Sequence, residues 1–227
     1  MEAEIPVFSF EIGSFSVNIG EAILVQWGIM LILGIGAFLL TRNLKRKPNK
    51  KQVVLETLYT TVENLVKGNM GENFTSYIPY IGTLIVYLLA LNLIGLVGLK
   101  PPTQSLSVTL ALGASTFIVI NATALKRNGV LKYMKGLTQP YAFMLPINIM
   151  ERAMLPFSLA LRLFGNMLAA TILVDMVYEA LESIVWVAGI GLPVFAHVYF
   201  DMFDGLIQML VFTMLTMINI KLTAEHH

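Results

Sequence analysis

The chain has 227 residues, of which 56% are hydrophobic and only 13% are charged, and its mean hydropathy is +0.74. This composition is typical of a polytopic membrane protein. The sequence contains no cysteine, which excludes a disulfide framework and a thiolate metal site. The formal net charge is +1, so the distribution of the charges says more than their sum.

Basic residues are absent from positions 1–41 and then gather in two clusters. By the positive-inside rule, both clusters face the cytoplasm, whereas the acidic residues near the N-terminus and at 179 and 182 belong to the opposite side. The acidic N-terminus has no positive n-region, which argues against a cleaved signal peptide. The two clusters are Arg42, Lys45, Arg46, Lys47, Lys50 and Lys51, and Lys126, Arg127, Lys132 and Lys135.

Three apolar segments match the length of about 20 residues that a helix needs to cross the hydrocarbon core. They are residues 19–41, 75–99 and 104–125, and the last two are joined by a turn at Lys100-Pro101-Pro102-Thr103. Residues 52–68 alternate apolar and polar side chains with helical periodicity, which predicts an amphipathic helix, either interfacial or extending into the cytoplasm. Residues 129–140 suit a short segment on the cytoplasmic surface.

The last third of the chain predicts two long helices, over residues 143–183 and 191–222, joined by a turn at 189–193. The first is about 60 Å long, roughly twice the hydrocarbon thickness, so it must be tilted, kinked or buried against protein. We therefore predict an all-α polytopic membrane protein that forms a single membrane domain. It has about five transmembrane helices, the last two of which form a long tilted hairpin, and in addition a surface helix. The N-terminus is outside and the C-terminus is in the cytoplasm.

A lone arginine, Arg162, lies within the first hairpin helix, where an unpaired charge is costly and marks a functional site. At 100° per residue, its face also carries polar residues between it and the cytoplasmic end. Beyond Asn166 the polar residues move to nearly the opposite face. The first group is Asn148, Glu151, Ser158 and Asn166, and the second is Thr171, Asp175, Glu179 and Glu182.

The second hairpin helix carries one polar stripe, formed by His197, Asp201, Asp204 and Gln208. These positions lie within about 40° of one another and rise about 16 Å from the outer end. The two helices together predict a pathway for ions. Taken singly, several of these residues also fit a structural role. Polar side chains can form hydrogen bonds between membrane helices, a histidine can be one of these hydrogen-bonded residues, and acids at the outer loop can simply face water.

Other kinds of site lack a sequence signal. No Walker-type glycine loop, no metal-spaced His/Cys cluster and no facing Ser/His/Asp arrangement is present. We therefore predict no catalytic residue, no cofactor, no metal and no nucleic-acid partner, with any nucleotide chemistry on another chain.

The segment from Ser158 to Met167, SLALRLFGNM, resembles the signature of subunit a of the F-type ATP synthase. The segments PPTQSLSVT from Pro101 and NLIGL from Asn92 support the resemblance, as does Gln208 followed by Leu215-Thr216. The likeness covers about residues 74–222. It implies transmembrane helices that end in two long tilted ones wrapped around a rotating ring of c subunits.

The resemblance also implies roles. Arg162 would be the essential stator arginine that forces the ring carboxylate to release its ion and separates two half-channels. Gln208, Ser158 and Asn166 would be its polar neighbours. The implied partners are the c-subunit ring, the b subunits of the peripheral stalk, the other ATP synthase subunits and the lipid bilayer. The lack of cysteine and the two basic clusters fit a bacterial plasma membrane.

The chain departs from the common pattern of that family at several positions. Thr171 stands where many members carry an acid, and Asp201 stands where a histidine or glutamate is frequent. Ser105 and Ser107 replace common Asp and Asn residues. The outer pathway is therefore expected to use a rearranged set of side chains.

The expected function is that of an ion-translocating stator subunit, not itself an enzyme. Ions would enter past His197, Asp201, Asp204 and Asp175 or Glu179, and leave past Arg162 through Ser158, Glu151 and Asn148. The alternatives are a self-sufficient secondary transporter or channel and, with weaker support, an intramembrane hydrolase. The sequence leaves open whether the ion is a proton or sodium.

Overall fold

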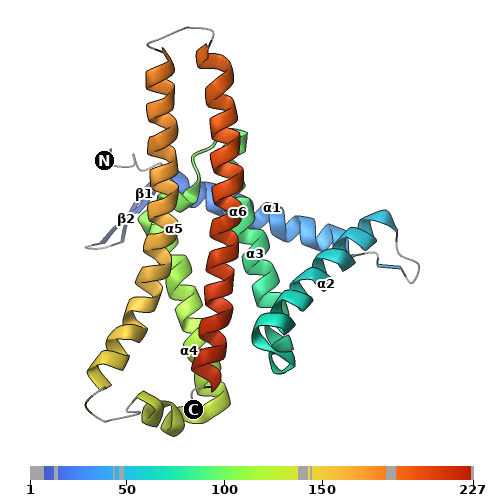
Figure 1. Ribbon diagram of the computed structural model, residues 1–227, viewed down its shortest axis with the longest axis vertical. Coiled ribbons are helices and arrows are strands. Elements are labelled where there is room, and N and C mark those ends of the chain that lie inside the picture. The colour runs from blue at the N-terminus through green and yellow to red at the C-terminus, as the bar shows by residue number, and fades with distance from the viewer. Residues whose placement is uncertain are drawn as a thin grey trace.

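The computed structural model describes residues 8–12, 15–42, 44–45, 49–137, 143, 145–182 and 188–225. The chain forms a helical bundle with a small hairpin at its N-terminal end (Figure 1). In chain order, the elements are β1 (Phe8–Ile12), β2 (Phe15–Ile19), α1 (Glu21–Thr41), α2 (Lys50–Met70), the 3-10 helix η1 (Glu72–Tyr77), α3 (Ile78–Leu93), the 3-10 helices η2 (Ile94–Val97) and η3 (Pro102–Gln104), α4 (Leu106–Leu137), α5 (Leu145–Glu182) and α6 (Ala188–Glu225).

Five helical segments of the described residues are long and apolar enough to cross a membrane. They are Glu21–Thr41, Glu72–Val97, Leu106–Arg127, Leu145–Val177 and Met202–Ala224. This confirms the predicted fold class, a helical multi-pass membrane protein with about five spans. The remaining long helix, α2, is the one for which an amphipathic helix is predicted.

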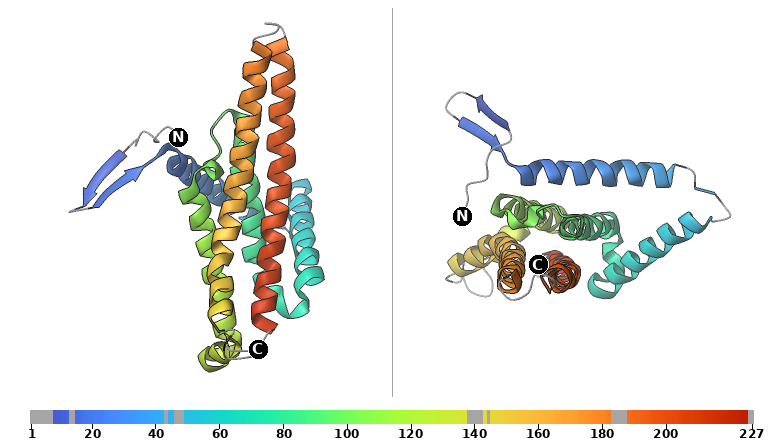
Figure 2. Two further views of the ribbon diagram at one scale, coloured as in Figure 1. Left: turned by 60° about the vertical axis from the view of Figure 1, so that its left-hand side comes forward. Right: turned by 90° about the horizontal axis from the view of Figure 1, so that it is seen from above.

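Two short strands precede α1, and the sequence analysis did not anticipate them. β1 and β2 pair antiparallel, with Phe8 opposite Ile19 and Ile12 opposite Phe15. Apolar and polar residues alternate in both strands, the period of two that favours extended chain. The hairpin projects away from the helical bundle (Figures 1 and 2).

α2 packs against the bundle only through its C-terminal part, where Val66 and Met70 are buried. Its N-terminal half exposes apolar side chains, among them Val54 and Leu58. On the same helix, Glu63 lies 2.8 Å from Lys67 and raises the pKa of the Lys67 ammonium through a hydrogen bond and charge attraction. An exposed pair one helical turn apart contributes little to stability, so burial of the C-terminal part holds α2 in place.

α4 is broken at Gly129, whose φ of 73° lies in the left-handed region that favours glycine. The break separates the apolar span from a short terminal segment, in agreement with the surface segment expected from residue 129. Tyr133 in that segment donates a hydrogen bond to the side chain of Asn121. The segment is therefore tied back to the span that precedes it.

α5 and α6 are each 38 residues long, or about 57 Å, and run side by side (Figure 1). α1 runs across their long axis (Figures 1 and 2). Because a 21-residue helix such as α1 matches the hydrocarbon thickness when upright, α5 and α6 cannot be upright at the same time. This geometry fits the expected tilt of the hairpin.

The turn predicted at residues 189–193 is wrong, because α6 already begins at Ala188. Pro193 is the sixth residue of α6, beyond the first turn, and as a proline it has no N–H to donate to the carbonyl oxygen of Gly189. The connection between α5 and α6 falls within 183–187, outside the described residues.

Two clusters of apolar side chains form the core. One joins α1, α3, α4, α5 and α6 around Leu88, Leu163 and Phe212. The other joins α2, η1, α3, α4 and α6 around Phe74 and Ile220. α4 and α5 approach closely at Gly113, where an added Cβ would lie 2.5 Å from the carbonyl oxygen of Pro156. Such small-residue contacts are how membrane helices pack tightly.

Candidate functional site

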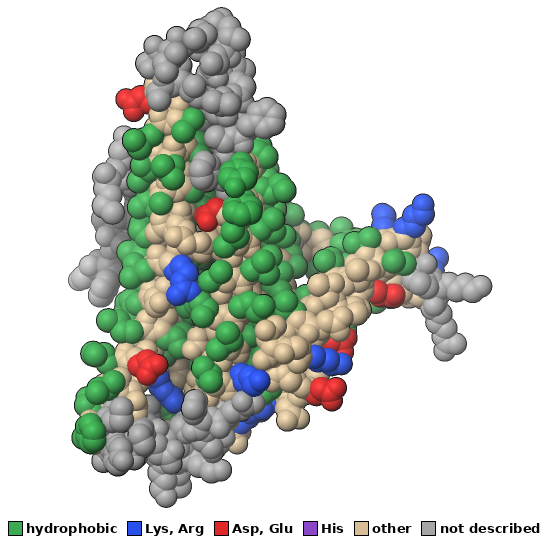
Figure 3. Space-filling view, viewed as in Figure 1, with side chains coloured by type: hydrophobic (Ala, Val, Ile, Leu, Met, Phe, Trp, Pro, Cys, Tyr) green, Lys and Arg blue, Asp and Glu red, His purple; other side chains and the backbone are tan. Residues whose placement is uncertain are grey.

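Arg162 lies in the apolar span Leu145–Val177 of α5 and is half-buried. Among the residues that the structure describes, its guanidinium has no ion-pair or hydrogen-bond partner. The adjoining face of α5 is apolar and open: Phe157 is 51% exposed and Leu161 54% exposed. Figure 3 shows the same pattern over α5 and α6, where charged side chains are sparse among hydrophobic ones. The arginine therefore stands at the edge of an uncovered apolar surface.

The polar residues predicted to share a face with Arg162 are accessible in the structure. Ser158 and Asn166, one helical turn before and after it, are both exposed. Towards the N-terminal end of α5, Glu151 is exposed and Asn148 is half-buried. The buried side of the helix carries Leu159, Leu163 and the residues in line with them instead. The stripe thus runs beside the packed face rather than within it.

The second group of polar residues on α5 lies round the other side of the helix. Thr171 is nine residues from Arg162, which places the two on opposite sides of α5. Thr171 is half-buried, and its hydroxyl accepts a 2.6 Å hydrogen bond from the amide of Gln104 in η3. Asp175 and Glu179, further along α5, are exposed. The two polar groups therefore lie on opposite sides of α5, with the packed face between them on one side and exposed apolar residues on the other.

On α6, Gln208 and Asp204 are neighbours one helical turn apart. Gln208 is 5% exposed, and Asp204 is half-buried with Gln208 as its hydrogen-bonding neighbour. The other carboxylate oxygen of Asp204, Oδ2, is buried and has no partner among the described residues. His197 and Asp201 belong to α6, but their side chains lie outside the described part of the chain. No hydrogen bond within that part joins Arg162 to Gln208.

A buried polar network that the sequence analysis did not assign lies next to Asp204. The amide of Asn92 on α3 donates to the carbonyl oxygen of Gly205 at 3.2 Å, and the hydroxyl of Thr103 donates to the Asn92 carbonyl at 3.3 Å. Asn92 is 1% exposed and Thr103 is fully buried. With the bond from Gln104 to Thr171, the turn around η3 is tied to both long helices. The sequence signal that could have indicated this network is the pair of polar residues, Thr103 and Gln104, that follows the two prolines.

Replacing Asn92 with alanine should loosen α6. The change removes a buried hydrogen bond and leaves the hydroxyl of Thr103 without its acceptor, so we expect a loss of about 1–3 kcal/mol in stability. Thermal unfolding of the detergent-solubilised protein measures it. The matched control is Asn69→Ala, which removes only a 2.7 Å bond to Leu65 in its own helix. Equal effects of the two changes would contradict a role for the network in positioning α6.

Comparison with known proteins adds to this geometry. The family model described as ATP synthase A chain matches residues 23–221. The chain belongs to the ATP synthase A chain family. It is thus similar to a membrane subunit of the ATP synthase complex along most of its length.

Several relatives cover nearly the whole chain. ATP synthase subunit a of Moorella thermoacetica is 33% identical over 227 residues, which are 98% of this chain and 98% of that protein. Subunit a 1 of Crocosphaera subtropica is 32% identical, with 93% of both chains covered. The sodium ion specific subunit a of Propionigenium modestum is 31% identical over 92% of this chain and 75% of its own length. The predicted membership of the ATP synthase subunit a family is confirmed.

Proposed function

We propose that the chain is the ion-translocating stator subunit of a rotary F-type ATP synthase, with two offset half-channels and with Arg162 facing a ring of c subunits. The observation that carries this proposal is that Arg162 lies in an apolar span without a partner for its charge among the described residues. A guanidinium at bilayer depth costs at least about 2.5–3.5 kcal/mol unless it meets protein or water. Arg162 has no partner among the described residues of its own chain.

The partner of Arg162 should therefore be supplied by another subunit. A membrane carboxylate on a ring subunit has the complementary charge, and the exposed Phe157 and Leu161 offer an apolar surface for a helix to slide along. An arginine that meets each carboxylate in turn favours its ionised form and so releases the bound ion. The same positive charge repels a cation that would otherwise leak directly between the two sides.

The positions of the polar residues support two separate half-channels. One consists of Asn148, Glu151 and Ser158 on the Arg162 face of α5, and is assigned to the cytoplasmic side. The other consists of Asp175 and Glu179 on α5 with His197, Asp201, Asp204 and Gln208 on α6. The buried, unpartnered Oδ2 of Asp204 supports ion binding there, because a buried carboxylate oxygen needs a cation or a donor. Asn166 lies beside Arg162, between the two.

The offset between the two groups supports a pathway that an ion does not complete within this chain alone. Arg162 and Thr171 lie on opposite sides of α5, with buried apolar residues between them. Transfer from one half-channel to the other would need a carrier, which is the role of the ring carboxylate. One charge moving through 100 mV yields about 2.3 kcal/mol, so several ions per turn must pass to drive ATP synthesis.

The proposal also assigns partners and orientation. The b subunits of the peripheral stalk would hold the chain still against the ring, and ATP chemistry would take place on other subunits. The N-terminus is outside and the C-terminus in the cytoplasm, in a bacterial plasma membrane. The two basic clusters support this orientation.

Reconstitution into vesicles tests the proposal. The whole complex should take up ions when ATP is added, and the purified chain alone should conduct neither protons nor sodium. Collapsing the proton gradient and the sodium gradient separately in the same vesicles identifies the ion. Ion flux through the purified chain alone would instead favour the alternative, a self-sufficient transporter or channel.

A further inference from the structure

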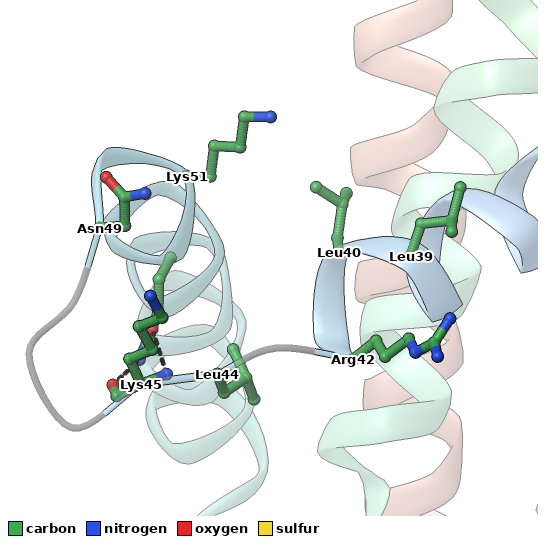
Figure 4. Close-up of a pocket in the computed structure, with 8 residues that line it drawn as sticks. Leu39, Leu40, Arg42, Leu44, Lys45, Asn49 and Lys51 are labelled. Carbon is green, nitrogen blue, oxygen red and sulfur yellow. Dashed lines mark hydrogen bonds between the residues drawn. The ribbon is translucent and has the colours of Figure 1, made fainter.

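A cavity of about 750 Å³ lies between the end of α1 and the start of α2 (Figure 4). Its basic lining residues are Arg42, Lys45 and Lys51, and its apolar ones are Leu39, Leu40 and Leu44. In Figure 4, Leu40 and Lys51 lie on facing sides of the gap. This cavity lies outside the proposed ion pathway, because none of its lining residues belongs to α5 or α6, the helices that carry that pathway.

The charge of the cavity is uncompensated. No acidic residue is among the described residues that line it, and Arg42, Lys45 and Lys51 have no ion-pair partner in the described part of the chain. Figure 4 shows Arg42 and Lys51 extending in different directions from the two sides of the opening. The like charges that line this opening repel one another, and an anion there would lower that repulsion. Arginine can bind a phosphate through two parallel hydrogen bonds, and lysine adds a point charge.

The backbone that carries these cations is held in place. The amide nitrogen of Lys45 donates to the side chain of Gln52 at 3.0 Å, and the Gln52 amide donates back to the Lys45 carbonyl at 2.9 Å. Asn49 caps α2 by accepting a 2.9 Å hydrogen bond from the amide of Lys50. The short connection is therefore fastened to the first turn of α2, which fixes Lys45 opposite α1. Preorganisation of this kind lowers the cost of binding.

The place of the cavity identifies the anion. α1 is a candidate membrane span that ends at Thr41, so the cavity begins where the apolar helix leaves the hydrocarbon. The leucines at its wall continue an exposed apolar surface along α1, where Ile35 and Phe38 are 58% and 64% exposed. A ligand that fits both parts has a negative headgroup and hydrocarbon chains.

We infer that this cavity binds the headgroup of an anionic phospholipid, with the phosphate in the opening that Arg42, Lys45 and Lys51 line and an acyl chain along Leu39 and Leu40. Binding would fix the angle between α1 and α2 at the membrane surface. The inference does not depend on the route that ions take, because none of these residues belongs to the two polar stripes.

Photocrosslinking to lipids tests the inference. The whole complex is reconstituted in phosphatidylcholine vesicles that contain a small fraction of photoactivatable phosphatidylglycerol or, in parallel, photoactivatable phosphatidylcholine. Peptide mass spectrometry then locates the crosslinks. We expect phosphatidylglycerol to label residues 39–52 preferentially. The variant R42Q/K45Q/K51Q should reduce that preference at least about fivefold, the effect of one basic residue near an anionic surface.

Controls separate a defined site from general attraction. Lys50→Gln removes the same charge from the neighbouring position, which does not line the cavity, and should leave the preference nearly unchanged. An equal loss with K50Q would overturn the inference in favour of diffuse attraction. Displacement of the lipid by inorganic phosphate at millimolar concentration would overturn it in favour of a soluble anion. Crosslinking of the cavity to another subunit instead of lipid would show that a protein fills it.

Discussion

Arg162→Ala should abolish ATP-driven ion uptake by the assembled complex while leaving assembly intact. The guanidinium has no partner among the described residues of the chain, so removing it deprives the fold of no known contact. Loss of one preorganised electrostatic group commonly costs about 10²–10³-fold in rate, and uptake should fall by at least the lower figure. Fluorescence quenching of a pH dye in vesicles measures it for protons, and ²²Na⁺ uptake measures it for sodium.

The control for this prediction is another arginine of the same helix. Arg152 lies ten residues earlier, with its guanidinium 4.7 Å from the ring centre of Tyr133, and Arg152→Ala should retain coupled uptake. Arg162→Lys keeps the positive charge but not the planar, bidentate geometry, so an intermediate rate is expected. Undiminished coupled uptake by an assembled Arg162→Ala complex would refute the stator role.

Gly113→Ala should weaken the packing of α4 on α5. An alanine Cβ at this position would lie 2.5 Å from the carbonyl oxygen of Pro156 and 3.4 Å from the Cβ of Ala160. The first neighbour is backbone and cannot rotate away, so the helices must separate. Overpacking of this kind costs about 1–3 kcal/mol, against a gain of about 0.5–1 kcal/mol from helix propensity. Gly113→Leu should abolish assembly altogether.

Gly34→Ala on α1 is the matched control, because an added Cβ there meets nothing within 4 Å. It should preserve or slightly raise thermal stability through helix propensity alone. The midpoint of thermal inactivation of the solubilised complex measures both variants. If Gly113→Ala were as stable as Gly34→Ala, the close approach of α4 to α5 would not exist in the native protein.

The helical fold was predictable from the sequence because a membrane span requires a long apolar segment that is easy to recognise. A span needs about 20 apolar residues, and basic residues mark its cytoplasmic end. The β1–β2 hairpin was missed because two five-residue strands give a weak pattern beside a 21-residue apolar helix. The start of α6 was misplaced because Gly189, Gly191 and Pro193 are ordinary turn residues, whereas the helix already begins at Ala188.

Only the parts of the candidate site that lie on a single helix were predictable from the sequence. Arg162 and its stripe follow from sequence spacing on a single helix, as does the pairing of Asp204 with Gln208. The contacts of Asn92 with Gly205 and of Gln104 with Thr171 join residues 113 and 67 positions apart. Such contacts depend on how the helices are arranged in three dimensions, and helical periodicity contains no information about that arrangement.

The sparse packing of α1 has a consequence for biosynthesis. Only Ile29 of its 21 residues is buried, so the helix gains little from the rest of the chain. The backbone N–H and C=O groups of a helix pair with one another, and the apolar side chains of α1 can contact lipid directly. α1 can therefore insert as an independent first span while α3 to α6 are still being translated. The late steps of maturation then belong to the C-terminal hairpin, whose apolar side chains are buried only against other helices of the core.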